Sequence, residues 1–298
     1  AFYCCSGFKG VFNFSLSYTE FCNEAFCGCS GFTGNLVLRD IIYHEYVFAN
    51  CSGFTSIDLQ TNKVTNLNKG TFKGCIGIKD VKLAPKSIVH SYAFEGCTQI
   101  NDINIDDVSL FYPYVFVNCV NLKGPIRFSD SIENISEGLF YNCYSIKSIE
   151  IGENIKNIEQ KAFYNCTSLS GSLVLPFNIE SINEESFYKT NITEIIYYPP
   201  MPPAICASNS FSNKPKLTLS EIYIYADFCG IPFDKNHDEN SPIEIQPSNP
   251  ANESFGNVEI SGGDSESIAK KIEKAFEELR KSHKNTIKIV VVDPGVFD

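Results

Sequence analysis

Residues 155–175 read Ile-Lys-Asn-Ile-Glu-Gln-Lys-Ala-Phe-Tyr-Asn-Cys-Thr-Ser-Leu-Ser-Gly-Ser-Leu-Val-Leu, and they contain one unit of a motif that recurs along the chain. The Phe of this motif returns every 22 to 24 residues, at Phe2, Phe26, Phe48, Phe72, Phe94, Phe116, Phe140, Phe163 and Phe187. All but the last are followed three residues later by a cysteine: Cys5, Cys29, Cys51, Cys75, Cys97, Cys119, Cys143 and Cys166. So short and regular a period predicts a solenoid, in which each unit buries its apolar side only by stacking on its neighbours.

Each unit ends in an alternating stretch such as Leu173-Val174-Leu175, which is the pattern of a strand with one buried face. A second inward residue precedes each Phe by five positions, as at Phe21, Tyr43, Leu67, Val89, Phe111, Ile135, Ile158 and Ile182. The segment from this residue to the cysteine is too short for a standard helix, so we predict a turn or a single 3₁₀ turn there.

The repeated cysteines are predicted to form an unbridged, buried column. Equivalent positions in stacked turns lie about 4.8 Å apart, but their side chains point in the same direction rather than at each other. Thr190 takes the position in the ninth unit, which indicates a preference for a small side chain. Single cysteines in each repeat also lack the paired spacing of a zinc site. A disulfide among the crowded cysteines of the first two units remains an open alternative, at Cys4, Cys5, Cys22, Cys27 and Cys29.

The repeated pattern I-x-x-I-x-x-x-A-F-x-x-C-x-x-L, followed by x-L-x-L-P, resembles the BspA-like, or Treponema pallidum-type, leucine-rich repeat. The resemblance covers about residues 1–233 and about nine to ten repeats. It implies a curved solenoid with a parallel β-sheet on its concave face. It further implies a location on the cell surface or outside the cell, and roles in adhesion to host matrix or to other cells. The family has no catalytic residues to carry over.

The repeat pattern loosens after Asn191, and the end of the chain divides into three parts. Residues 204–233 are predicted to cap the solenoid, with a last strand over Glu221–Tyr225. Cys206 occupies the inward position of this unit, so we interpret it as a core residue in preference to a disulfide with Cys229. The polar residues 234–256 are predicted to be a linker. Residues 257–298 are predicted to be a small β-α-β segment, with strands at 257–261 and 286–292 and a helix at 265–282. We interpret this segment as a unit that is truncated, pairs with another copy or folds back on the solenoid.

Candidate binding residues come from the outward strand positions, because the concave face of such repeats is the usual contact surface. These positions are Asn13, Val37, Asp58, Lys82, Asn104, Arg127, Glu150, Val174, Ile196 and Tyr223. An apolar and aromatic strip near the end is the first candidate, formed by Val174, Ile196, Tyr198, Tyr223 and Tyr225. The alternative is that the C-terminal segment or the Pro-rich loop covers these side chains. Arg127 and Glu150 are further candidates, although a solvated charged row is the preferred interpretation of their surroundings.

Composition excludes several classes of function. The net charge of −11 disfavours nucleic acid and anionic membranes and favours a cationic or neutral partner. No apolar run is long enough for a membrane span, and the first residues do not have the pattern of a signal peptide. The sequence begins inside a repeat, which we interpret as a mature form or a fragment. Four histidines, His44, His90, His237 and His283, show no catalytic or metal-ligand spacing, so no cofactor or metal is predicted.

The sequence therefore predicts a non-enzymatic module that recognises a protein or glycan ligand through the concave strand face, at the cell surface or secreted. The alternative is an intracellular, cytoplasmic repeat scaffold that organises partner proteins, because free buried cysteines suit a reducing compartment equally well.

Overall fold

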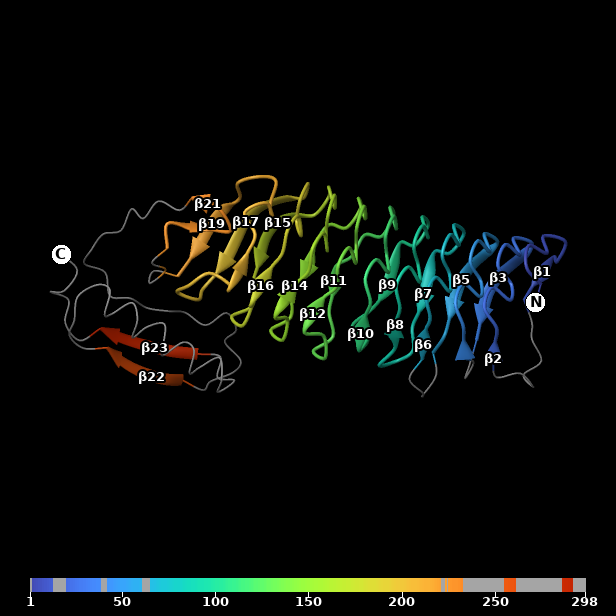
Figure 1. Cartoon of the computed structure of the whole chain (residues 1–298), viewed down its shortest axis with the longest axis horizontal. Helices are drawn as coiled ribbons and strands as arrows, with labels where there is room; N and C mark the ends of the chain where they lie inside the picture. Colours follow the sequence, from blue (N-terminus) through green and yellow to red (C-terminus); the bar gives the residue numbers. More distant parts are fainter. Residues whose placement is uncertain are drawn as a thin grey trace.

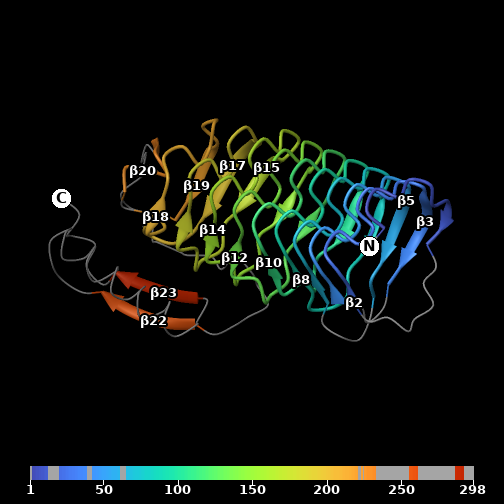
Figure 2. The ribbon, with the colours of Figure 1, turned by 45° about the vertical axis from the view of Figure 1, so that its right-hand side comes forward.

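The chain is a parallel-strand β-solenoid, in which successive turns stack along one long axis (Figure 1). The computed structural model describes residues 2–12, 20–38, 42–60, 65–220, 223, 225–232, 255–260 and 286–291. Two columns of strands run along the stack and lie on different sides of each turn (Figure 2). The predicted repeat solenoid is thus confirmed.

Eight strands of the long-strand column, from β3 to β17, correspond to strands that the alternating pattern predicts, whereas the first and last strands of the column lie at other positions. It consists of β1 Gly10–Val11, β3 Phe32–Val37, β5 Phe54–Asp58, β7 Asp80–Lys82, β9 Asp102–Asn104, β11 Ile126–Arg127, β13 Ile149–Glu150, β15 Ser170–Val174, β17 Asn191–Tyr197 and β19 Lys216–Leu219. They form the parallel groups β1-β3-β5-β7-β9, β11-β13 and β15-β17-β19. Within these groups equivalent residues pair, as in Ile57↔Val81 and Val81↔Ile103, so the buried side chains of paired strands stack on one another.

The short-strand column was not predicted. Its two-residue strands are β2 Glu20–Phe21, β4 Ile42–Tyr43, β6 Asn66–Leu67, β8 Ile88–Val89, β10 Leu110–Phe111, β12 Asn134–Ile135, β14 Asn157–Ile158, β16 Ser181–Ile182 and β18 Ile205–Cys206. The second residue of β2 to β16 is the inward residue that the sequence indicated, and in each of these strands it is buried. A turn follows, as predicted for the segment up to the cysteine. Two residues are too short for an alternating pattern, so the sequence could not distinguish this strand from the turn.

The repeated phenylalanines form a continuous stack through the core. The ring centroids of Phe94 and Phe116 are 5.6 Å apart, and those of Phe116 and Phe140 are 5.2 Å apart, with nearly parallel rings in both pairs. From Phe48 to Phe187 these rings are completely buried. The expected continuous inward column is confirmed, and it is the main apolar contact between neighbouring turns.

The repeated cysteines form a second column beside the rings, and they are free thiols. From Cys29 to Cys166, each thiol donates to the carbonyl oxygen of the Phe in the preceding turn, for example Cys119 Sγ to Phe94 O at 3.2 Å and Cys143 Sγ to Phe116 O at 3.0 Å. The exception is Cys5 in the first turn, whose thiol donates to Tyr3 O. The same direction from Cys29 to Cys166 keeps neighbouring sulfur atoms from facing each other, as predicted. Burial raises the pKa of the column thiols from Cys29 to Cys166, that of Cys51 to about 12.

The C-terminal end of the solenoid departs from the prediction in two ways. Its last long strand is β19, whose Leu217 pairs with Ile195, whereas Tyr223 and Tyr225 within the predicted strand are not in a strand. The error arises because the connection after Phe211 is shorter than in earlier turns, so the alternating stretch that forms the strand comes sooner. Residues 221, 222 and 224 lie outside the described residues.

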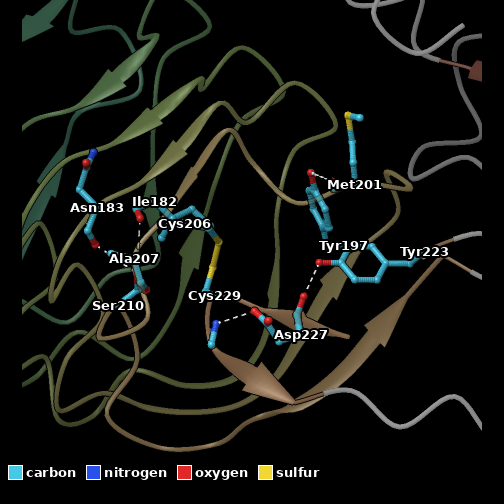
Figure 3. Close-up of a disulfide and its surroundings, with 11 residues drawn as sticks. Ile182, Asn183, Tyr197, Met201, Cys206, Ala207, Ser210, Tyr223, Asp227 and Cys229 are labelled. Carbon is cyan, nitrogen blue, oxygen red and sulfur yellow. Dashed lines mark hydrogen bonds between the residues drawn. A yellow bond between two sulfur atoms is a disulfide. The ribbon is translucent and has the colours of Figure 1, made fainter. Parts of the chain in front are cut away.

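The second correction concerns Cys206, which forms a disulfide with Cys229 rather than remaining a core thiol (Figure 3). Cys206 does occupy the inward position, in register with Ile182. Cys229, however, lies in the turn of the antiparallel hairpin between β20 (Asp227–Phe228) and β21 (Ile231–Pro232), with a positive φ of 48°. This hairpin departs from the repeat geometry, so the Cys229 side chain is not held in the common direction of the cysteine column. The Cα atoms of Cys206 and Cys229 are 4.8 Å apart, which is within the range of disulfides.

The last described elements are β22 Phe255–Ile260 and β23 Thr286–Val291, which pair in parallel. They correspond to the two strands expected at 257–261 and 286–292. The predicted helix at 265–282 and nearly all of the predicted linker lie outside the described residues, except that 255–256 belong to β22.

Candidate functional site

The solvent side of the long-strand column, called here the long-strand face, carries most of the candidate binding residues. Strand register aligns them in rows: Val37, Asp58, Lys82 and Asn104, then Arg127 and Glu150, then Val174, Ile196 and Thr218. Thr218, not Tyr223, therefore continues the row beyond Ile196. Asn13, the first residue predicted for it, lies outside the described residues.

The middle of the long-strand face is charged and internally paired. Arg127 Nε donates to Glu150 Oε2 at 2.6 Å, and Nη2 donates to Oε1 at 2.8 Å. This two-point contact lowers the pKa of Glu150 and raises that of Arg127. Both side chains are more than half exposed, so the pair remains solvated. The geometry agrees with the solvated row that the sequence favoured.

The C-terminal part of the long-strand face has a different character, because apolar side chains are exposed there. Val174 is 47% exposed, and Ile196 beside it is half-buried. Both lie in the group β15-β17-β19, where β15 and β17 pair over five registered positions. These side chains are presented on a backbone that is hydrogen-bonded across neighbouring strands.

Glu194 is a residue of this surface that the sequence analysis missed. Ser172 Oγ donates to Glu194 Oε2 at 2.6 Å, and Thr218 Oγ1 donates to Oε1 at 2.7 Å. Lys216 Nζ lies 3.4 Å from Oε1. The two hydroxyl hydrogen bonds and the lysine lower the pKa of Glu194, so its carboxylate is ionised at neutral pH. The signal was present in the repeat spacing, since Ser172, Glu194 and Lys216 occupy the same position in successive strands.

The three tyrosines of the predicted strip are not equivalent. Tyr223 is fully buried, and its hydroxyl donates to the carbonyl oxygen of Asp227 at 2.7 Å (Figure 3). Its predicted exposure is therefore wrong, because Tyr223 packs into the end of the core instead of standing on a strand. Tyr225 is 36% exposed and its ring lies 5.8 Å from that of Tyr223. Tyr198 follows β17 and is half-buried.

The two histidines among the described residues contact different partners. Within the described ranges, no cluster of three or more His, Cys, Asp or Glu side chains could hold a metal ion. His44 pairs with Glu20 at 2.6 Å on the surface, and His90 stacks on Tyr112 at 4.4 Å. His237 and His283 lie outside the described residues.

A family model for the BspA type leucine-rich repeat region matches residues 1–123 and 87–218, with six copies of the repeat. The chain belongs to the BspA-type leucine-rich repeat family. The resemblance expected from the motif is thereby confirmed, and the BspA-type repeat is a protein-interaction module. No curated protein matches the sequence.

Solved structures with a similar fold include other leucine-rich repeat proteins. The Treponema pallidum leucine-rich repeat protein is 19% identical, with 60% of this chain and 67% of that chain covered and a TM-score of 0.38. A leucine-rich repeat protein from Bacteroides ovatus is 17% identical, with 74% and 79% covered and a TM-score of 0.36. A leucine-rich cell surface protein from Faecalibacterium prausnitzii is 12% identical, with 70% and 71% covered and a TM-score of 0.37. In the described part of this BspA-type chain, no helix has the length and apolar character needed to cross a bilayer.

Proposed function

We propose that this BspA-type repeat protein is a non-enzymatic adhesion or recognition module that binds an extracellular protein or glycan through the C-terminal part of the long-strand face. The observation that carries the proposal is the exposed apolar pair Val174 and Ile196 next to the ionised Glu194. Exposed apolar side chains provide contact area for a ligand. A carboxylate that is held in place by hydrogen bonds can fix the orientation of that ligand.

The chemistry of this surface favours a cationic or hydroxyl-bearing ligand. The Glu194 carboxylate is oriented by Ser172 and Thr218, so it loses little side-chain freedom when it accepts a further hydrogen bond. The net charge of −11 also favours the approach of a basic partner. Arg127 and Glu150 already satisfy each other, so we assign them a secondary role in ligand contact.

The disulfide between Cys206 and Cys229 supports a location at the cell surface or in the secreted fraction, because structural disulfides persist in oxidising compartments. The intracellular scaffold is the alternative, and the free thiols of the buried column are compatible with it.

The proposal is tested by screening the purified full chain against extracellular matrix proteins and a glycan array, then measuring affinity for the strongest ligand. We expect Val174→Lys to weaken binding about tenfold or more. Val37→Lys is the matched control, because Val37 occupies the same row at the other end and is 48% exposed. Glu194→Gln should weaken binding of a basic protein most and that of a neutral glycan less, because the amide oxygen can still accept a weaker hydrogen bond from a hydroxyl.

Equal loss of affinity in the Val174 and Val37 variants would contradict the assigned surface. The absence of any extracellular ligand, together with recovery of intracellular partners only, would support the scaffold alternative. Melting curves of both variants must stay close to that of the wild-type chain, since both side chains are exposed.

A further inference from the structure

Cys4 and Cys27 lie on the first two turns of the solenoid, and the structure records both as free thiols. They have the same separation along the chain, 23 residues, as the bridged pair Cys206 and Cys229. This separation is about one repeat, so it places two residues on neighbouring turns at nearly equal height. Cys4 and Cys27 precede β1 and β3, whereas Cys206 lies in β18 and Cys229 between β20 and β21, and Figure 1 shows these strands at opposite ends of the stack.

The backbone geometry brings Cys4 and Cys27 within bridging range. The amide nitrogen of Cys4 donates to the carbonyl oxygen of Cys27 at 2.7 Å. A direct backbone hydrogen bond holds two Cα atoms within about 6 Å, which lies inside the range of disulfides. Cys4 Sγ also reaches the next turn, since it lies 3.1 Å from the position that a Cβ on Gly28 would occupy.

The direction of the side chains separates this pair from the buried cysteine column. In the column, Cys29 Sγ donates to the carbonyl oxygen of Phe2 at 2.9 Å, and the members up to Cys166 make the same contact with the preceding turn. Cys4 has a positive φ of 54° and is exposed, so its thiol lies outside the column. Cys229 of the existing disulfide shares this backbone conformation, with a φ of 48°. Both pairs thus combine neighbouring turns with one cysteine in a left-handed turn position.

We propose that Cys4 and Cys27 form a second structural disulfide when the protein meets a low-molecular-weight disulfide oxidant. The Cys4 thiolate attacks one sulfur of oxidised glutathione, which releases one glutathione thiolate and leaves a mixed disulfide on Cys4. The Cys27 thiolate then attacks Cys4 Sγ, which releases the second glutathione thiolate. The two protein thiols are oxidised, the glutathione disulfide is reduced, and the two thiol protons pass to solvent.

The order of these steps follows from accessibility. Cys4 is exposed and reaches the oxidant first, whereas Cys27 is buried. Burial, with Glu24 and Cys4 nearby, raises the pKa of Cys27, so the second step should accelerate as the pH rises above neutrality. Formation of the bridge would join the first turn to the second by a covalent bond, as the observed disulfide joins Cys206 of the last short strand to the closing hairpin.

The test uses the full chain in a glutathione redox buffer, followed by alkylation and tryptic digestion without reduction. Cleavage after Lys9 and Arg39 places Cys4 and Cys27 on the adjacent peptides 1–9 and 10–39. We expect these two peptides to be recovered as one cross-linked species, with fragment ions that assign the bond to Cys4 and Cys27. The Cys206–Cys229 cross-link in the same digest is the internal positive control.

Variants make the assignment specific. Cys4→Ser and Cys27→Ser should each abolish the cross-link, whereas Cys5→Ser and Cys22→Ser should leave it intact. Cys22 is the matched control because it is also an exposed, free cysteine near this end. Hydrogen exchange should show at least about tenfold stronger protection of residues 2–12 after oxidation of the wild-type chain, and no such gain in Cys4→Ser.

Three results would overturn the proposal. The first is a digest in which Cys206–Cys229 is bridged while peptides 1–9 and 10–39 remain unlinked. The second is a cross-link that survives in Cys4→Ser, since another pair would then be responsible. The third is a bond between Cys4 residues of two chains, detected as a covalent dimer on a non-reducing gel.

Discussion

The middle of the solenoid and its C-terminal end are held together in different ways. In the middle, Phe94, Phe116 and Phe140 repeat the same stacked contact, and the column cysteines beside them, Cys119 and Cys143, repeat the same hydrogen bond. At the C-terminal end, a disulfide joins Cys206 and Cys229, and the buried Tyr197 and Tyr223 hydroxyls donate to the carbonyl oxygens of Met201 and Asp227 (Figure 3).

The reason for this difference is that a middle turn has neighbours on both sides and an end turn has not. In the middle, stacking of equivalent residues is enough to bury the apolar side chains, because each turn has a similar turn on both sides. In the described residues, β19 is followed by the β20–β21 hairpin instead of another repeat. The disulfide between Cys206 and Cys229 joins this hairpin to the last short strand. Non-repeating residues at the end of a repeat array therefore deserve the same scrutiny as the repeat itself.

The largest effect is expected in the middle, from Phe116→Ala. Phe116 is fully buried and stacks on a ring on each side, so its removal leaves a cavity between two turns. We expect a loss of about 3–5 kcal/mol in the free energy of unfolding, measured by urea denaturation followed by circular dichroism.

Phe2→Ala is the matched control in the same column, because Phe2 is 44% exposed. It should cost about 1 kcal/mol or less. Similar losses for the two variants would show that the middle gains nothing from having neighbours on both sides.

A smaller, more local effect is expected at the C-terminal end from Cys206→Ala. Removal of the disulfide frees a segment of 23 residues in the unfolded chain, and the expected loss is about 2–4 kcal/mol. Hydrogen exchange should place the loss of protection in residues 190–232 and leave residues 90–170 nearly unchanged.

Cys22→Ala is the control for this variant, since Cys22 is exposed and unbridged. Loss of protection spread evenly over the whole stack in Cys206→Ala would contradict the division between middle and end. It would show that the disulfide stabilises every turn.

The smallest effect is expected from Arg127→Ala on the long-strand face. The ion pair with Glu150 has good geometry but is solvent-exposed on both sides, and such pairs contribute little to stability. The melting temperature should stay within about 1 °C of the wild-type value in differential scanning calorimetry. Glu150→Ala provides the reciprocal control, and a large shift in either variant would indicate a structural role for the pair.

Repetition explains which features were predictable. The inward columns were predicted because each position is sampled in many turns, so that an individual substitution such as Thr190 does not hide the pattern. A residue at a position without several equivalents in other turns could not be checked against a repeated pattern. Tyr223 continued an apparent outward row, and Cys206 continued an inward column, but the structure buries the first and bridges the second.

The candidate site shows the same division. The row of Val174 and Ile196 follows from alternation along a strand, and the structure places both side chains in it. The hydrogen bonds of Glu194 with Ser172 and Thr218 join three different turns. They depend on the orientation of side chains across strands, which a one-dimensional pattern does not specify.

The sequence by itself determined the repeat period, the identity of the buried columns and the unbridged state of the repeated thiols. The reason is that regular spacing aligns equivalent side chains in neighbouring turns, and their common direction keeps the thiols from facing each other. Only the tertiary structure decided the short-strand column, the position of the last long strand, the closing disulfide and the burial of Tyr223. These depend on where the chain turns when no further repeat follows, and that is decided by contacts between segments rather than by the pattern within one of them.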